Sequence, residues 1–150
     1  MTHLIDTNIL LRSCEPDHPL FKSARDTIKL LVAQGYYLYV APQNLIEFWC
    51  VCTRSKDKNG LGYSTEQTQQ EVEKIKVMFS LLSDNELIYY EWERLVKYYG
   101  VKGVNVHDAR LVATMIAHKL THIITFNVKD FRRYSEINII DPDVFNKSKK

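Results

Sequence analysis

Three acidic residues stand beside apolar sequence, where a soluble protein ordinarily avoids charge. Asp6 follows the apolar pair Leu4-Ile5, Glu47 lies between Leu45-Ile46 and Phe48-Trp49, and Asp108 opens a segment rich in small residues. Burying an isolated carboxylate is costly, and packing several together raises their pKa values unless a cation neutralises them. The three acids together therefore predict a metal site.

The ligand types indicate which metal such a site would take. Every candidate donor is an oxygen, and Asp130 supplies a further acid. Carboxylates completed by water suit Mg²⁺ or Mn²⁺ rather than Zn²⁺, and Mg²⁺ is the physiological default. Such a site activates water for attack on phosphorus and stabilises charge on the leaving oxygen, so it needs no side-chain nucleophile. Accordingly, the sequence has no GxSxG motif, P-loop or Rossmann glycine motif.

Each acid also has a simpler interpretation. Asp6 could be a turn residue, Asp108 a helix cap favoured by the helix dipole, and Glu47 an ion-pair partner of Arg54. Asp130 could be a solvated loop acid. The joint occurrence of these acids in apolar surroundings favours the metal site over the separate explanations.

The elements that must position the acids follow from hydrophobic patterning. Short runs rich in β-branched and aromatic residues predict strands at Leu4-Ile5, at residues 36–40 and at residues 122–125. Longer segments with helical spacing separate them, which predicts an α/β fold with a mainly parallel sheet and helices on its faces. Ligands in such sheets collect at the carboxyl ends of strands, where Asp6 and residues 127–130 emerge. Asp108, at a helix N-terminus, can point into the same crevice.

Four helices are predicted from the spacing of apolar residues and from their end signals. One begins at Pro42 and carries Glu47 one turn inside it. A second follows Ser64, which can form a capping box with Gln67. A third stops at Gly100, and a fourth follows residues 105–108.

Length and composition predict one soluble domain covering residues 1–150. The 150 residues are 45% hydrophobic and 25% charged, as in ordinary globular proteins, and a domain of this size buries roughly 70% of its unfolded surface. Residues 56–62 have loop chemistry, and residues 147–150 are predicted to be a disordered tail. The net charge of +2 gives no strongly basic footprint, so a polyanion partner requires local basic residues.

The cysteines and the apolar segments indicate a cellular compartment. Three cysteines without a CxxC pair favour reduced thiols in a cytoplasm over a disulfide framework. No segment has the length of a membrane span, and the N-terminus reaches Asp6 too early for a signal peptide. We therefore expect a cytoplasmic protein that does not enter a membrane.

Four motifs occur in a fixed order along the chain. They are Leu4-Ile5-Asp6-Thr7-Asn8-Ile9-Leu10, Asn44-Leu45-Ile46-Glu47-Phe48, His107-Asp108-Ala109-Arg110-Leu111-Val112-Ala113 and Ile124-Thr125-Phe126-Asn127-Val128-Lys129-Asp130-Phe131. Together they closely resemble PIN domains, most of all the VapC-like toxins of bacterial toxin–antitoxin systems, from about His3 to Pro142. The resemblance implies a Rossmann-like three-layer α/β/α sandwich and a Mg²⁺-dependent endoribonuclease for which Mn²⁺ can substitute. It also implies an RNA substrate, a cognate antitoxin protein and a homodimer.

The resemblance further implies a ligand set. Asp6, Glu47, Asp108 and a fourth acid would hold one or two Mg²⁺ ions, with Asp6 and Asp108 as the principal ligands. Many relatives carry an acid two residues after the threonine of the last motif, where this chain has Asn127, so Asp130 is the expected fourth acid. An amide can still coordinate through its oxygen or orient a water, and both one-ion and two-ion sites remain open.

Supporting residues are implied in the same way. Thr7 and Asn8 resemble polar residues that orient the first acid or contact the scissile phosphate, and Thr125 resembles a second support of this kind. RNA would need cations beside the acids, and Arg110 and Lys129 are the best placed in sequence. The other basic candidates, each more often a solvated surface charge than a phosphate contact, are Arg12, Arg54, Lys56, Lys58, Arg132 and Arg133.

Two other functions compete with the ribonuclease. A phosphatase of the haloacid dehalogenase type would use Asp6 as a nucleophile, but it needs an acid two residues later, where this chain has Asn8, and it leaves Glu47 unexplained. A PIN fold kept only as an RNA-binding or protein-binding module would be expected to lose its acids, and all four are present. His118 and His122 are four residues apart, but the predicted break between helix and strand separates them, so they do not form a metal pair.

Overall fold

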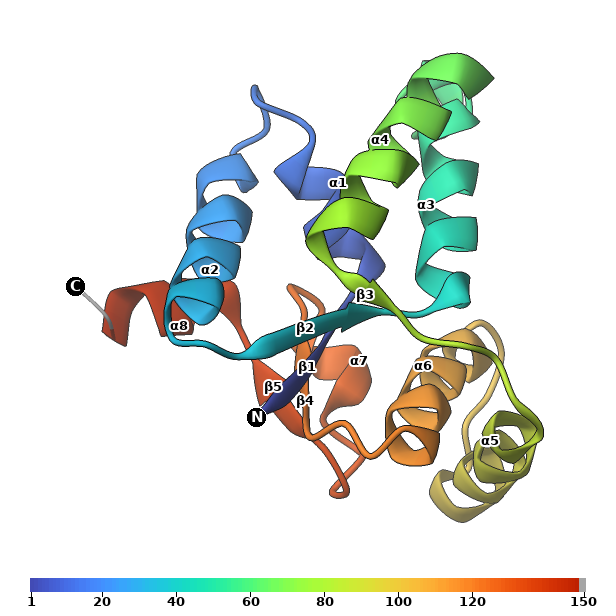
Figure 1. Ribbon diagram of the computed structural model, residues 1–150. Coiled ribbons are helices and arrows are strands. Elements are labelled where there is room, and N and C mark those ends of the chain that lie inside the picture. Colours follow the sequence, from blue (N-terminus) through green and yellow to red (C-terminus); the bar gives the residue numbers. More distant parts are fainter. Residues whose placement is uncertain (149–150) are drawn as a thin grey trace.

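The computed structural model describes residues 1–148, and within that span a five-stranded parallel sheet forms the centre of the molecule (Figure 1). In the order β3-β2-β1-β4-β5 across the sheet, the strands are β1 Thr2–Ile5, β2 Tyr37–Val40, β3 Ser80–Leu81, β4 His122–Ile124 and β5 Asn138–Ile140. Every neighbouring pair is parallel, so the predicted sheet type is confirmed.

Helices connect the strands and cover both faces of the sheet. They are α1 Thr7–Ser13, α2 Phe21–Ala33, α3 Pro42–Thr53, α4 Thr65–Met78, α5 Glu86–Tyr99, α6 Asn105–Ala117, α7 Val128–Phe131 and α8 Pro142–Ser148. Figure 1 shows α1 to α4 on one side of the sheet and α5 and α6 on the other, which gives the expected three layers. No helix within residues 1–148 is long and apolar enough to cross a membrane.

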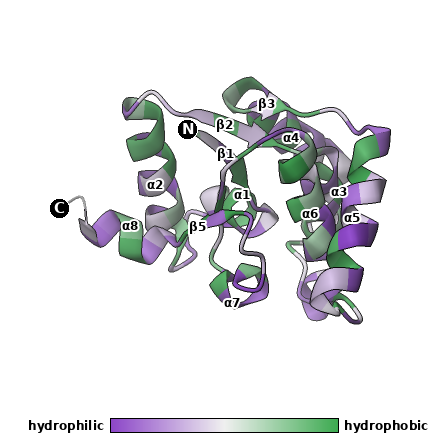
Figure 2. Ribbon diagram, turned by 90° about the horizontal axis from the view of Figure 1, so that it is seen from below, coloured by the Kyte–Doolittle hydropathy of each residue, from purple (hydrophilic) through white to green (hydrophobic). Residues whose placement is uncertain are grey.

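The central strands divide the core into two clusters. On β1, Leu4 packs in the cluster shared with α5 and α6, whereas Ile5 packs in the cluster shared with α1 to α4. Ile123 and Ile124 of β4 separate in the same way. Successive strand side chains point to opposite faces, so consecutive apolar residues fit strands that are covered on both sides. In Figure 2, α2 and α5 carry both hydrophobic and hydrophilic residues along their lengths, as helices with one buried face do.

Three predicted helix ends agree with the structure, whereas α6 begins at Asn105, earlier than the predicted start after residues 105–108. Ser64 Oγ accepts a hydrogen bond from the Gln67 N–H at 3.0 Å, and Gln67 Oε1 accepts one from the Ser64 N–H at 2.9 Å, so α4 begins with the expected capping box. Pro42 is the first residue of α3. Helix α5 stops at Gly100, whose φ of 61° is a left-handed conformation that favours glycine.

Several elements lack a strong local signal and were not predicted. Strands β3 and β5 are only two and three residues long, and α1 follows β1 with no loop between them. The predicted loop at residues 56–62 contains a short 3₁₀ helix, Lys56–Lys58. Of the predicted tail, Lys147 and Ser148 end α8, and residues 149–150 lie outside the described residues.

Strand β1 lies where the chain changes direction across the sheet. From β1 the chain builds outward to β2 and β3, and it then returns to place β4 and β5 on the other side. Ligands of open parallel sheets bind outside the carboxyl ends of the strands at such a point. Asp6 follows β1 and Thr125 follows β4, so the fold brings these two residues to that position.

Candidate active site

Asp6 joins the central strand to α1. Its backbone N–H donates to the Ile124 carbonyl at 3.0 Å, and its extended backbone, with φ −69° and ψ 154°, makes it the N-cap of the helix. The carboxylate Oδ1 accepts from the Thr7 N–H at 2.8 Å. The side chain is 5% exposed. Asp6 is therefore a buried helix cap, which replaces the alternative of a simple turn residue.

The Thr125 hydroxyl holds the other oxygen of that carboxylate. It donates to Asp6 Oδ2 at 2.7 Å and accepts from Asn8 Nδ2 at 3.3 Å and from the Asn127 N–H at 2.9 Å. Asn8 Oδ1 in turn accepts from the Phe126 N–H at 3.3 Å. Two of the predicted supports, Asn8 and Thr125, thus fasten the end of β4 to the first turn of α1 around Asp6.

The Thr7 hydroxyl does the same for Glu47. It donates to Glu47 Oε1 at 2.7 Å and accepts from Asn44 Nδ2 at 3.2 Å. Asn44 is fully buried, and its Oδ1 accepts from the Ala41 N–H at 2.8 Å, where α3 begins. The first turns of α1 and α3 are thereby joined, and Glu47 is directed toward the carboxyl end of β1.

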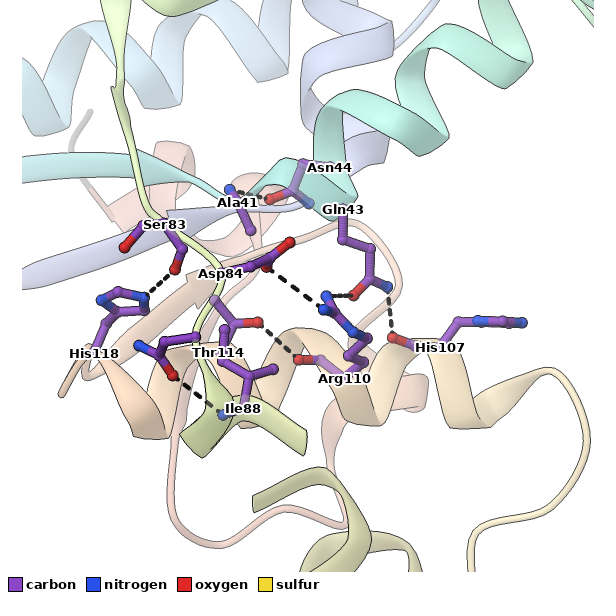
Figure 3. Close-up of polar contacts among 11 residues, drawn as sticks. Ala41, Gln43, Asn44, Ser83, Asp84, Ile88, His107, Arg110, Thr114 and His118 are labelled. Atoms are coloured by element: carbon purple, nitrogen blue, oxygen red, sulfur yellow. Dashed lines mark hydrogen bonds and ion pairs between the residues drawn. The ribbon is translucent and has the colours of Figure 1, made fainter. Parts of the chain in front are cut away.

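Gln43, the second residue of α3, connects Glu47 to α6. Its Nε2 donates to Glu47 Oε2 at 3.2 Å and to the His107 carbonyl at 2.8 Å. Its Oε1 accepts from Arg110 Nη1 at 3.2 Å. Figure 3 shows the Gln43 amide between the Arg110 side chain and the backbone of His107, and Asp84 on the far side of Arg110.

Asp108 and Asp130 complete the set of acids. Asp108 is half-buried in the first turn of α6, where the helix dipole favours an anion. The N-cap of α6 is Val104, so the alternative of Asp108 as a helix cap does not apply. Asp130 is half-buried in α7, and its charge raises the pKa of Asp108. Asp130 is thus close enough to Asp108 for their charges to interact, and it is not fully exposed to solvent.

The electrostatics show that the acids interact. Burial raises the pKa of Asp6 to about 7, hydrogen bonds from Thr125 and Thr7 oppose the rise, and the charges of Asp108 and Glu47 add to it. Burial also raises the pKa of Asp108 to about 6, with further contributions from Asp130 and Glu47. Asp6, Glu47 and Asp108 therefore lie within electrostatic reach of one another, and Asp130 lies within reach of Asp108.

The donor set fits a hard cation. The groups that hold Asp6 and Glu47 are hydroxyls, amides and a backbone N–H, all neutral, so no hydrogen-bond partner cancels these two charges. Within the described part of the chain, no three His, Cys, Asp or Glu side chains are arranged as a ready-made metal cage. Mg²⁺ binds through one or two carboxylates and keeps several waters, so the arrangement suits Mg²⁺ better than a metal that needs a closed protein cage.

The basic candidates divide into engaged and exposed side chains. Arg12 pairs with Glu15 at 2.6 Å, and Arg54 donates to the Asn59 carbonyl at 3.2 Å rather than to Glu47. The Arg54–Glu47 ion pair considered from the sequence is therefore absent. Arg110 reaches Asp84 at 3.5 Å as well as Gln43, and Lys129 is exposed on α7 beside Asp130.

Sequence reasoning missed Gln43 and, as a functional residue, Asn44. Both are buried polar side chains in the first turn of a helix, directly after Pro42. An asparagine and a glutamine at a helix start are usually read as capping or solvated residues. The usable signal was the spacing, because Gln43 stands four residues before Glu47 and so lies on the same helix face.

Comparisons with known proteins bear on the family and the fold. A sequence model of the PIN domain matches residues 3–137. Three similar solved structures cover nearly the whole chain: VapBC2 of Rickettsia felis bound to a promoter DNA fragment (TM-score 0.71, 19% identity, 93% of this chain and 98% of that one), VapBC-1 of nontypeable Haemophilus influenzae (0.69, 22%, 95% and 99%) and a toxin–antitoxin complex of Klebsiella pneumoniae (0.64, 21%, 93% and 97%). No curated protein matched the sequence. At these identities the solved structures establish the fold.

Proposed function

The chain belongs to the PIN domain family, and on that premise we propose that it is a Mg²⁺-dependent endoribonuclease that hydrolyses RNA phosphodiester bonds. The observation that carries the proposal is the buried Asp6 carboxylate, which lies within reach of two other acids and is held by neutral donors. A structural carboxylate in this position would be expected to have a cationic partner. A buried carboxyl whose ionisation is costly and has no cationic partner is suited to a metal ion, which would stabilise the charged form.

The four acids would hold the cation. Each oxygen of Asp6 and Glu47 accepts one hydrogen bond in the described structure, and an ionised carboxylate oxygen can accept more than one partner. Both acids can therefore keep their positions and still bind. When bound, Mg²⁺ would lower the pKa of an attacking water and stabilise charge on the phosphate and the leaving oxygen.

The chain's own residues would orient these groups and the substrate. Thr7 and Thr125 fix the two carboxylates through short hydroxyl contacts of 2.7 Å, so that little reorganisation is needed when substrate arrives. Arg110, which the sequence favoured together with Lys129, is engaged by Gln43 and Asp84. The exposed Lys129, next to Asp130 in the sequence, and the exposed Arg133, whose charge lowers the pKa of Asp108, are better placed to attract the phosphate backbone. Arg12 and Arg54 already contact neighbouring residues, which makes them weaker candidates.

A biological role follows by analogy with the solved complexes. The toxin–antitoxin complex of Klebsiella pneumoniae contains a chain of the same fold. By analogy we propose that this chain is a toxin that is bound by a small antitoxin protein. We also propose that this chain forms a homodimer. On this proposal, expression of the chain alone arrests growth, and co-expression of the antitoxin restores it. Harmless expression of an enzyme that cleaves RNA would count against the toxin role.

Cleavage of total RNA by the purified protein, with mapped ends, tests the enzyme directly. We expect cleavage that requires Mg²⁺ or Mn²⁺, stops in EDTA and is lost in Asp6→Asn and Asp108→Asn, with the fold retained. Asp26→Asn, on α2, where Asp26 pairs with the exposed Lys22 at 2.6 Å, is the matched control. Equal cleavage by a folded Asp6→Asn/Asp108→Asn double variant would overturn the proposal. Folded protein that binds RNA without cutting it would support the alternative of a catalytically weak binding module.

A further inference from the structure

We infer that Gln43 is a positioning residue that aims Glu47 at the proposed cation site and fixes α3 against α6. The inference rests on the proposed function, because it concerns the geometry of a proposed ligand. Gln43 itself is an amide on the second position of α3, with only 9% of its surface exposed. A buried amide needs partners, and every partner of this one belongs to the acidic site or its border.

The amide uses both of its N–H donors and its oxygen to join two helices. One N–H bond reaches Glu47 Oε2, one turn along α3, and the other reaches the carbonyl of His107, the residue before Asp108. The amide oxygen accepts from Arg110, two residues after Asp108. Figure 3 shows the Gln43 contacts to His107 and Arg110, which lie on either side of Asp108 in the sequence of α6. Gln43 therefore contacts α6 at two points while it also holds Glu47.

The same contacts fix the orientation of Glu47. Thr7 holds Oε1 and Gln43 holds Oε2, so rotation of the carboxylate would break at least one hydrogen bond. The side chain borders an open hollow of about 450 Å³, which Gln43, His107 and Arg110 also line. Without these two donors, a half-exposed glutamate would be free to turn into that hollow.

Gln43 also engages Arg110, a cation that could compete with the metal ion for Glu47. Arg110 lines the same hollow as Glu47, yet its guanidinium is engaged by Gln43 Oε1 and by Asp84. A guanidinium that paired with Glu47 would neutralise the charge that a metal ion needs. The amide accepts from Arg110 on its oxygen and donates to Glu47 from its nitrogen, so it separates the two charges and keeps Glu47 available.

The experiment compares Mn²⁺ affinity by calorimetry and RNA cleavage in the full chain. In Gln43→Met, which keeps the length of the side chain and removes its hydrogen bonds, we expect Mn²⁺ affinity and kcat to fall by about 10- to 100-fold, as is typical when a partner of a metal ligand is lost. KM for RNA should change far less. Gln43→Asn, whose side chain is one methylene too short to join both helices, should show the same defect. It provides the test if Gln43→Met folds poorly.

Two controls separate positioning from simple loss of stability. Gln69→Met removes the same kind of contact on an exposed helix, because Gln69 Nε2 donates to Glu73 one turn along α4 at 2.9 Å. Thr68→Val removes a buried hydroxyl that donates to the Ser64 carbonyl at 2.9 Å, also on α4. Both should keep wild-type Mn²⁺ affinity, and the second should do so even if its melting temperature falls.

The outcomes distinguish this inference from the proposed function. Wild-type cleavage with no effect of either Gln43 variant would overturn the positioning role and leave the ribonuclease intact. Mn²⁺ binding that depends on Gln43 in a protein without cleavage would overturn the ribonuclease and leave the positioning role intact. A wild-type protein that binds no Mn²⁺, or a Thr68→Val loss of affinity equal to that of Gln43→Met, would overturn the inference.

Discussion

Replacing Asp6 with asparagine should stabilise the metal-free protein at alkaline pH while it abolishes the proposed cleavage. Folding raises the pKa of this buried carboxyl from 3.8 to about 7, so the folded state favours the protonated form. The ionisation cost is absent below pH 3.8, grows as the pH rises and is complete above pH 7. The difference in pKa corresponds to about 4 kcal/mol of lost stability at pH 8.

The asparagine recovers part of this energy. Its amide nitrogen would face the Thr125 hydroxyl, which already accepts from Asn8 and from the backbone of Asn127. Such a strained contact costs about 1–3 kcal/mol. We therefore expect Asp6→Asn to gain about 2 kcal/mol at pH 8, or roughly 4–8 °C in melting temperature for a chain of this length.

Thermal unfolding in EDTA between pH 4 and pH 8 measures the effect. Asp6→Asn should be less stable than wild type by about 1–2 kcal/mol at pH 4, where the contact cost outweighs the small ionisation cost. The difference should change sign as the pH rises, favour the variant by about 2 kcal/mol and level off above pH 7. Saturating Mn²⁺ should narrow it again, because only the wild type gains the full binding energy. A variant less stable than wild type by the same amount at every pH would refute the reasoning, since Asp6 would then act only as a helix cap.

Other substitutions test separate parts of the structure. Burial and the neighbouring His122 lower the pKa of the fully buried His3 from 6.5 to about 4. Wild type should therefore lose about 3 kcal/mol of stability as the pH falls from 6.5 to 4, and His3→Phe should remove this loss. Urea unfolding at pH 7 and pH 4.5 measures the difference. Ser64→Ala should lower the free energy of unfolding by about 1 kcal/mol, because it removes the capping box at the start of α4. Cleavage should not change, because none of the proposed metal ligands lies on α4. A drop in cleavage by the folded variant would contradict this. Asn127→Asp should tighten Mn²⁺ binding by roughly tenfold and Asp130→Asn should weaken it, because one carboxylate near a divalent ion contributes on the order of 1 kcal/mol or more. Calorimetry measures both affinities. Unchanged affinity in both variants would mean that neither position holds the metal.

The alternation of strands and helices could be predicted from the sequence because it depends on local signals. Consecutive apolar residues at Ile123 and Ile124 fit only an element that is covered on both faces, and the Ser64 and Gly100 end signals act within one helical turn. The short strands β3 and β5 were missed because two or three residues carry little periodicity, and pairing with a neighbouring strand decides their conformation.

The candidate site was likewise predictable from the sequence only in part. Residue type and apolar surroundings were enough to select Asp6, Glu47 and Asp108, because a carboxylate beside apolar sequence is costly unless something requires it. Which groups hold those carboxylates depends on contacts between residues far apart in the chain, such as Thr125 with Asp6 and Thr7 with Glu47. Gln43 is the clearest case, because its amide gains its meaning only when α3 packs beside the start of α6. The sequence by itself determined which residues could do chemistry, and the tertiary structure decided how they are held, since hydrogen bonds between distant segments exist only after the sheet brings those segments together.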